Sequence, residues 1–344
     1  MNGPLFRYPD IALPTVLAIV YAVGGYIFGF LLLSNINLWF PLGVLLLAHS
    51  MVIAAFLLHE CAHGSLFARQ SLGGLEPHRA LGLLLTWLTG SCYSDFDSLR
   101  DKHLRHHFER ADIVALDYRR LLAARPLLRK IIEVGQRWYL PAVELLFHGL
   151  AIVRPLIYGK NRGRVTVVLV LRLLFFYGIA SMLGWQALLG YALAYMLFIT
   201  VMGFMDAFQH QYLLLIGLEQ PRSQSPTMDR ERFAPGYFSR EYEQQHTFSN
   251  LISRRWPQLN WLVLNFCYHN AHHLRPAEPW YHLPHLHKQL LESPDVPVVI
   301  PFSRQLRSFF RYRVERVMAP ATDHLEPDPS QSPGAAGVSF LTPL

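Results

Sequence analysis

The sequence predicts an all-α integral membrane protein, with four transmembrane helices in two hairpins and a cytoplasmic helical cap. Of its 344 residues, 52% are apolar and only 16% are charged, which is unusual for a soluble protein. Four nearly uncharged runs of about 20 residues are each long enough to cross a bilayer core. We expect a membrane domain over residues 1–319. A disordered tail is expected over residues 320–344, which are rich in proline, serine and acidic residues.

The four runs form two pairs. Residues 11–33 and 38–58 are separated by a short polar turn, and residues 165–183 and 187–205 are separated by another. Each pair therefore predicts a helical hairpin. The first run has neither a basic segment before it nor a small-residue cleavage site after it, so we expect it to be retained rather than removed as a signal peptide.

The distribution of charge predicts the orientation. The 31 lysines and arginines lie before the first run, between the pairs or after the last run, with Arg172 the one exception. The positive-inside rule then places both termini and the central segment on the cytoplasmic side of an inner, cytoplasmic membrane. A basic face beside anionic lipid explains the net charge of +7, so no nucleic-acid partner is expected. Inside its span, Arg172 is expected to face the helix bundle and to pair with a polar group or a substrate oxygen. The alternative is a slightly shifted span that lets its side chain reach the interface.

Three other segments are expected near the membrane surface or in solvent. Residues 119–138 alternate basic and apolar side chains, which is typical of a helix lying along a membrane. Residues 141–158 are apolar but contain three interrupting polar side chains, so we expect an interfacial segment. Residues 219–243 are polar and contain three prolines, which predicts a surface loop.

Histidines recur in three boxes of similar spacing. Box one is His59-Glu60-Cys61-Ala62-His63, box two is His103-Leu104-Arg105-His106-His107, and box three is His269-Asn270-Ala271-His272-His273. In a helix, spacings of three and four residues place the imidazoles on one face. Together with His210, just after the last run, the boxes supply nine histidines. One zinc needs three or four protein ligands, so nine histidines indicate two metals. Imidazole alone does not distinguish Fe, Zn, Cu and Ni.

Other classes of metal protein remain open at this point. His59, Glu60 and His63 match the H-E-x-x-H pattern of zinc proteases, in which Glu60 would be the general base. That interpretation leaves the six histidines of boxes two and three without a role. A transporter or metal-storage protein would more typically place its ligands inside the spans. The three scattered cysteines form neither a disulfide framework nor an iron–sulfur motif.

Over about residues 38–287 the chain resembles the membrane fatty acid desaturase superfamily, whose boxes are H-x(3,4)-H, H-x(2,3)-H-H and H-x-x-H-H. The resemblance implies two hairpins of membrane helices and a cytoplasmic di-iron centre. It makes the following residues iron ligands: His59, His63, His103, His106, His107, His210, His269, His272 and His273. Asp206 departs from the asparagine of relatives with soluble substrates, which leaves open whether water or a carboxylate completes one metal's coordination.

Iron ions held only by neutral imidazoles keep their full positive charge, and nearby carboxylates would balance it. Glu60, Asp101 and Asp206 are close to the boxes in sequence, and each is expected to orient a histidine by accepting its N–H. They are therefore candidates for the layer of residues that surrounds the ligands.

The resemblance implies O2-dependent oxidation of a fatty acyl chain, in the first place desaturation of a fatty acid or acyl lipid. Oxidative decarboxylation of a free fatty acid to a 1-alkene is the alternative, followed by carotenoid hydroxylation or ketolation. The chain has no haem or iron–sulfur motif, so we expect an external electron donor: a ferredoxin, rubredoxin or cytochrome with its reductase. Arg100, Lys102 and Arg105 beside box two offer a docking surface for an acidic donor, or a contact with lipid.

Overall fold

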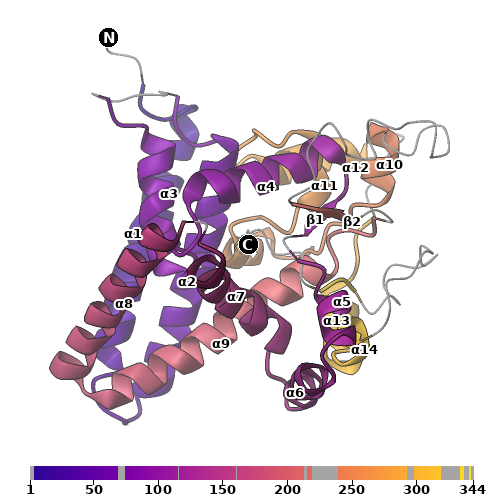
Figure 1. Ribbon diagram of the computed structural model, residues 1–344. Coiled ribbons are helices and arrows are strands. Elements are labelled where there is room, and N and C mark those ends of the chain that lie inside the picture. Colours follow the sequence, from indigo (N-terminus) through magenta and orange to yellow (C-terminus); the bar gives the residue numbers. More distant parts are fainter. Residues whose placement is uncertain are drawn as a thin grey trace. The chain divides into compact units, whose positions relative to one another are not determined.

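The computed structural model describes residues 4–68, 74–114, 116–159, 161–212, 215–218, 239–292, 298–318, 334–336 and 341. The chain divides into two compact units. Unit 1 comprises Met1–Ser98 and Phe147–Val201, and unit 2 comprises Leu99–Leu146 and Met202–Leu344. The described residues are mostly helical, as the composition predicts, and Figure 1 shows their elements coloured along the sequence.

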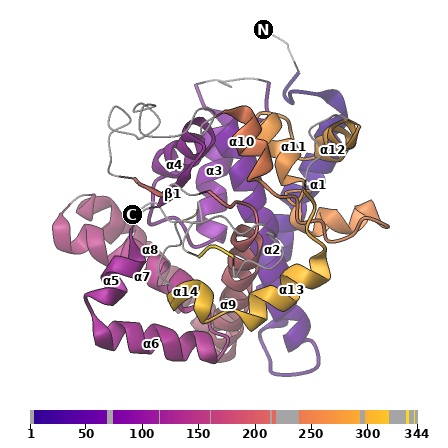
Figure 2. The same ribbon diagram turned by 90° about the vertical axis from the view of Figure 1, so that its right-hand side faces the viewer.

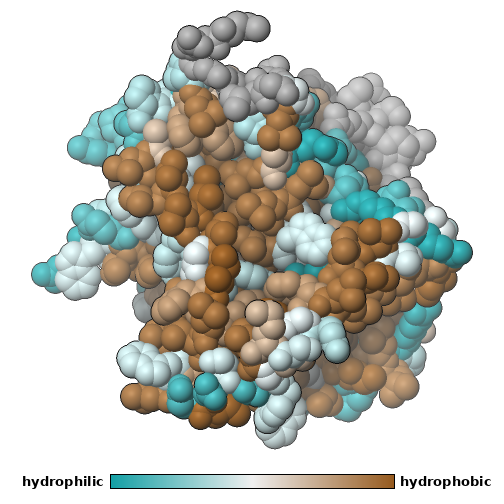
Figure 3. Space-filling view, turned by 90° about the vertical axis from the view of Figure 1, so that its left-hand side faces the viewer, coloured by the Kyte–Doolittle hydropathy of each residue, from teal (hydrophilic) through white to brown (hydrophobic). Residues whose placement is uncertain are grey.

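Four helices are long and apolar enough to cross a membrane. They are Pro9–Leu32 (η1 and α1), Phe40–His63 (α2), Arg162–Leu183 (α8) and Trp185–Ala207 (α9). Their bounds agree with the four expected runs to within a few residues, except that α2 extends through box one. Figure 3 shows a face of the molecule that is covered largely by apolar side chains, as expected for a surface in contact with lipid.

Small residues let α1 (Ala12–Leu32) and α2 pack closely within unit 1 (Figure 1). A Cβ at Gly29 would lie 3.0 Å from the Cβ of Leu47, and one at Gly43 would lie 2.9 Å from the Cβ of Leu32. Close backbone approach at glycine is typical of membrane helix pairs. The Tyr21 hydroxyl and Nδ1 of His49 form a 2.6 Å hydrogen bond between the two helices.

The expectation that Arg172 faces the helix bundle and pairs with polar groups is confirmed. Its side chain is buried, one guanidinium nitrogen donates to the carbonyl of Trp87 at 3.0 Å, and another donates to the Tyr191 hydroxyl at 2.8 Å. Trp87 lies in the last turn of α3 (Pro77–Leu88), and Tyr191 lies in α9. The arginine therefore ties α8 to two other helices of unit 1.

The remaining elements lie in unit 2 or run between the units along the chain. The helices are α4 (Phe96–Glu109), α5 (Tyr118–Ala123), α6 (Pro126–Arg137), α7 (Ala142–Tyr158), α10 (Arg240–Gln245), η5 (Pro257–Val263), α11 (His269–Leu274), α12 (Leu283–Leu291), α13 (Phe302–Arg311) and α14 (Glu315–Met318). Strands β1 (Asp112–Val114) and β2 (Leu215–Gly217) pair in parallel. This pairing joins the chain just after box two to the chain just after His210.

Several sequence expectations can be compared with these elements. Residues 119–138 fall on α5 and α6, and Figure 2 shows α13 and α14 near α6. The guanidinium of Arg313 lies 4.1 Å from the centre of the Tyr139 ring, just beyond α6. Contact of α6 with a membrane remains a prediction. A surface loop was expected over residues 219–243, and residues 219–238 of it lie outside the described residues. For the last part the expectation is wrong, because Glu243 is buried in α10.

The expected disordered tail also falls mainly outside the described residues. Within its described part, the amide of Ala335 donates to the carbonyl of Ala207 at 2.8 Å, and Leu341 is buried. Ala335 therefore lies at the end of α9 within unit 2.

Candidate metal centre

The histidine boxes lie on helices, as their spacing predicts. Box one occupies the end of α2, which stops at Gly64 with φ of 65°, a left-handed conformation that glycine adopts easily. Box two lies in the second half of α4, and box three opens α11.

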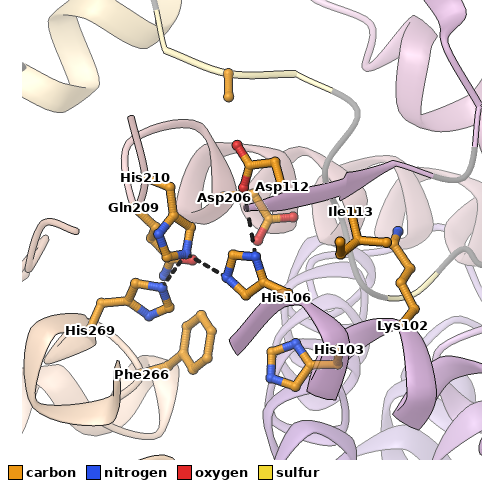
Figure 4. A pocket seen from close by; sticks show the side chains of 11 residues that line it. Lys102, His103, His106, Asp112, Ile113, Asp206, Gln209, His210, Phe266 and His269 are labelled. Atoms are coloured by element: carbon orange, nitrogen blue, oxygen red, sulfur yellow. Dashed lines mark hydrogen bonds and ion pairs between the residues drawn. The ribbon is translucent and has the colours of Figure 1, made fainter. Parts of the chain in front are cut away.

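Four imidazoles of unit 2 converge, and we call them cluster A: His106, His210, His269 and His273. Nε2 of His210 lies 3.1 Å from Nε2 of His106 and 2.7 Å from Nε2 of His269. One ring nitrogen each from His106, His210 and His273 lies within 4.8 Å of the others. Figure 4 shows the rings of His106, His210 and His269 turned toward one another.

A second group, cluster B, contains His103, His107 and His272. Nε2 of His107 lies 3.2 Å from Nε2 of His103 and 3.1 Å from Nε2 of His272. The ring centres of His107 and His273 are 4.2 Å apart, so clusters A and B are neighbours. Boxes two and three each contribute to both clusters.

Two rings of cluster A are oriented by partners on their outer side. Nδ1 of His106 donates to the carbonyl of Ala111 at 2.8 Å, which leaves a lone pair on its Nε2. Nδ1 of His273 lies 2.8 Å from a carboxylate oxygen of Glu243. The Nε2 of His273 is buried without a hydrogen-bond partner among the described residues. Metal-binding histidines typically have this arrangement, because the outer hydrogen bond fixes the tautomer that presents a lone pair.

The spacing of the ring nitrogens also fits bound metal. Two nitrogens that bind one ion at about 2.1 Å lie roughly 3.0 to 3.4 Å apart, close to the observed 3.1 Å between His106 and His210. Burial, and then the neighbouring imidazoles, hold the pKa of His210 well below its ordinary value. Its ring is therefore neutral, the form that binds metals. Both clusters have the donors that a metal such as iron requires.

Asn270, inside box three, positions α11. Its side-chain amide donates to the carbonyl of Gln244 at 3.1 Å, and its side-chain oxygen accepts from the Ser249 hydroxyl at 2.9 Å. A backbone bridge pairs His210 with Thr247 in the same segment. The chain after α10 thus holds box three and His210 together. The sequence offered Asn270 only as an unassigned residue between histidines.

Glu243 is a further site residue that sequence reasoning missed. It is 5% exposed, and its carboxylate contacts Nδ1 of His273 at 2.8 Å and Nε of Arg110 at 3.1 Å. Its position in a proline-containing polar segment predicted a surface loop. A weak signal existed in Ser239, which caps α10 by accepting from the amide of Tyr242 and so indicates a short helix.

Box one lies in unit 1. The ring centres of His59 and His63 are 4.6 Å apart, and His59 is fully buried. Glu60 lies beside His59, with Oε1 3.6 Å from Nδ1, and it accepts a 2.7 Å hydrogen bond from Ser65. Glu60 therefore lies next to a box histidine within unit 1, as expected.

Acidic groups and one lysine line a pocket beside cluster A. Figure 4 shows Asp112 and Asp206 near His106, with Lys102 in the same lining. Burial, and then the charge of Asp206, raise the pKa of Asp112 to about 7. Burial lowers the pKa of Lys102 to about 8, against the opposing effect of the two aspartates. Asp206 and His210 both line this pocket, as expected from their spacing of four residues.

One expectation for α4 needs correction. Lys102 and Arg105 are each 3% exposed, so they cannot form the proposed docking surface, of which Arg100 alone is exposed. Asp101 is exposed on α4, and its contact with a histidine remains a prediction. Within unit 2, the carboxylates of Glu243 and Asp112 lie beside His273 and His106. The physical reason is the helical period: adjacent residues of α4 point about 100° apart, so only some of them face the histidines.

The histidines outside the boxes have other partners. His246 bonds to the carbonyl of Tyr242 through Nδ1 at 2.8 Å, and His282 bonds to Glu278 at 2.7 Å. His285 lies 3.1 Å from the Gln289 amide. His287 packs against Tyr268. We expected these four to be loop or docking residues rather than ligands.

Comparison with protein families gives a match to the description Fatty acid desaturase over residues 36–300. The matched region contains all three boxes and His210. The chain belongs to the fatty acid desaturase family. A search of curated proteins found no match. Family membership indicates an oxidoreductase with an acyl substrate in a lipid environment, and the four apolar helices agree with an integral membrane protein.

One stability prediction concerns α4, the helix that carries box two. Arg105 and Glu109 form a buried i,i+4 ion pair at 2.7 Å. Replacing Arg105 by Gln should destabilise the protein by about 3 to 5 kcal/mol, because the Glu109 charge stays buried without its cationic partner. The thermal midpoint of purified protein measures this effect. Arg137→Gln is the control, since Arg137 and Glu133 have the same spacing and distance, but Arg137 is exposed and Glu133 is only half-buried. Equal shifts for both variants would contradict the prediction.

Proposed function

We propose that the protein is a membrane-bound di-iron oxidase that desaturates a fatty acyl chain with O2. The observation that carries this proposal is the pair of neighbouring imidazole clusters in a chain of the fatty acid desaturase family. When bound, iron supplies redox chemistry with O2 that can oxidise an unactivated C–H bond. The nine ligands would be those expected from the boxes and His210.

The two clusters divide these ligands. Cluster A would hold one iron through His106, His210, His269 and His273. Cluster B would hold the other through His103, His107 and His272, with His59 and His63 of box one completing it. This last assignment rests on the spacing of box one and on the three donors of cluster B, which leave coordination positions to be filled.

The other residues of unit 2 orient the ligands and balance charge. Glu243 holds His273, and the carbonyl of Ala111 holds His106. Because imidazoles bring no negative charge, the carboxylates of Glu243, Asp112 and Asp206 would offset part of the charge of the metals. Burial of most of the ligands keeps bulk water from the site, which strengthens these electrostatic interactions.

We further propose the membrane arrangement expected from charge: two helical hairpins in an inner, cytoplasmic membrane, with the cap and both termini on its cytoplasmic side. The acyl chain would enter from the bilayer, and electrons would come from a separate ferredoxin, rubredoxin or cytochrome. Oxidative decarboxylation of a free fatty acid to a 1-alkene is the second candidate.

Metal content tests the proposal directly. Protein purified after expression with added iron should contain two irons per chain by elemental analysis, because seven histidines form two clusters in unit 2 and box one adds two more donors. One zinc and no iron would instead favour the zinc protease that the H-E-x-x-H pattern of box one allows.

The reaction is identified by feeding labelled fatty acids to cells that express the protein and then analysing lipids and headspace. A new internal double bond is the expected product. A volatile 1-alkene would identify the decarboxylase. Modification of carotenoids alone would contradict both proposals.

A further inference from the structure

Arg172 is a buried cation in the middle of a membrane-spanning helix. It lies about 15 Å along α8 from Arg162, at 1.5 Å per residue, and a similar distance from Leu183. Its side chain is 5% exposed. A position so far from both helix ends prevents the guanidinium from reaching the aqueous interface easily. Its charge must therefore be balanced inside unit 1.

The charge balance distinguishes Arg172 from comparably buried arginines. Arg105 is paired with Glu109, and Arg316 interacts electrostatically with Glu144. By contrast, among the described residues no carboxylate contacts Arg172. Its hydrogen-bond partners are the Trp87 carbonyl and the Tyr191 hydroxyl, and both groups are neutral.

These neutral partners balance only part of the charge. The Trp87 carbonyl belongs to the last turn of α3, where the helix dipole supplies roughly half a negative charge. The guanidinium also lies 4.8 Å from the centre of the Phe176 ring, a cation–π contact. Its Nε is buried without a hydrogen-bond partner in the described part of the chain. The buried hydroxyl of Tyr26 lies near the same group.

We propose that Arg172, with Tyr191 and Tyr26, binds the carboxylate of a free fatty acid within the membrane-spanning unit. The inference rests on the proposed function for the identity of the ligand. A carboxylate supplies the missing negative charge and accepts the open Nε–H in a charge-assisted hydrogen bond. The rings of Phe30, Phe175 and Phe176 pack on one another beside the guanidinium and make its surroundings apolar, as an alkyl chain requires. A phospholipid phosphate has the same charge, but its two tails and head group hold it at the interface.

The test is a binding measurement on the full-length protein in lipid nanodiscs. Radiolabelled dodecanoate is displaced by unlabelled dodecanoate, by 1-dodecanol or by methyl dodecanoate, in mildly alkaline buffer that keeps the acid ionised. The acid should bind about 10- to 100-fold more tightly than the alcohol or the ester, as expected for a hydrogen bond between charged groups. Displacement by phosphatidylglycerol as effectively as by dodecanoate would assign the site to lipid phosphate and overturn the proposal.

Variants test whether the preference for the acid over the alcohol depends on Arg172. Arg172→Gln should lose the preference for acid over alcohol while it still binds the alcohol, and Arg172→Lys should keep part of it. Arg162→Gln, an exposed arginine at the start of the same helix, is the matched control and should bind like wild type. An Arg172→Gln protein that still prefers the acid would refute the site and make Arg172 a structural link between helices only.

A second measurement needs no variant, in case Arg172→Gln fails to insert. A fatty acid with a photoreactive diazirine beside its carboxylate should cross-link wild-type protein at peptides of α8 and α9 around Arg172 and Tyr191. Cross-links confined to other segments would overturn the proposal. Neither assay requires metal. If metal-free protein prefers the acid, the carboxylate site is supported even if the di-iron proposal fails. If iron-loaded protein is active but shows no preference for the acid, the di-iron proposal is supported and the carboxylate site is refuted.

Discussion

Replacing His210 by alanine is expected to remove metal and abolish activity as severely as replacing His272 does. Nε2 of His210 approaches two other ring nitrogens of cluster A, at 3.1 and 2.7 Å, so its loss removes a central donor. Residues that merely orient a ligand typically contribute 10- to 100-fold in metal affinity or activity, and a direct ligand should contribute at least about 100-fold. Iron content and turnover of membrane-inserted protein measure the effect.

His246→Ala is the matched control for this prediction. His246 follows α10 and bonds to the carbonyl of Tyr242, on whose ring it also stacks at 4.1 Å. Its replacement should leave two irons per chain and change turnover little. If His210→Ala kept both irons while His246→Ala lost them, the assignment of the ninth ligand would be wrong.

Replacing Glu243 by glutamine is expected to lower the affinity for metal by about 10- to 100-fold. The carboxylate accepts a 2.8 Å hydrogen bond from Nδ1–H of His273, which fixes the tautomer and makes Nε2 a better metal ligand. A neutral amide keeps the shape but weakens this hydrogen bond and removes negative charge near the metals. Competition with a chelator, using Co²⁺ and its visible spectrum, would report both affinity and geometry.

Glu241→Gln is the control, because Glu241 lies on the same short helix but is exposed to solvent. It should bind metal like wild type. A Glu243→Gln protein with unchanged affinity and an unchanged Co²⁺ spectrum would show that the carboxylate does not act on His273. Loss of one whole metal per chain would instead indicate that Glu243 binds metal directly, as its place in a group with His107 and His273 allows.

By itself, the sequence determined the four apolar helices and the helical histidine boxes. Both depend on local patterns: a span is a length of uncharged residues, and a box is a spacing that one helical turn converts into a shared face. The same reasoning placed Arg172 toward the interior of the helix bundle, because a cation in a span has few other stable positions. These features need no knowledge of which distant segments meet.

Only the tertiary structure decided how the ligands divide and what supports them. Boxes two and three each contribute to both clusters, and this arrangement follows from how α4 and α11 pack rather than from the spacing of either box. Glu243 was missed because its role comes from a contact with His273, thirty residues later in the chain. Lys102 and Arg105 were expected on the surface because they are charged. Their burial comes from the packing of neighbouring elements, which the sequence does not show. Charge and spacing are properties of a segment, whereas partners and burial depend on long-range contacts that a single sequence does not specify.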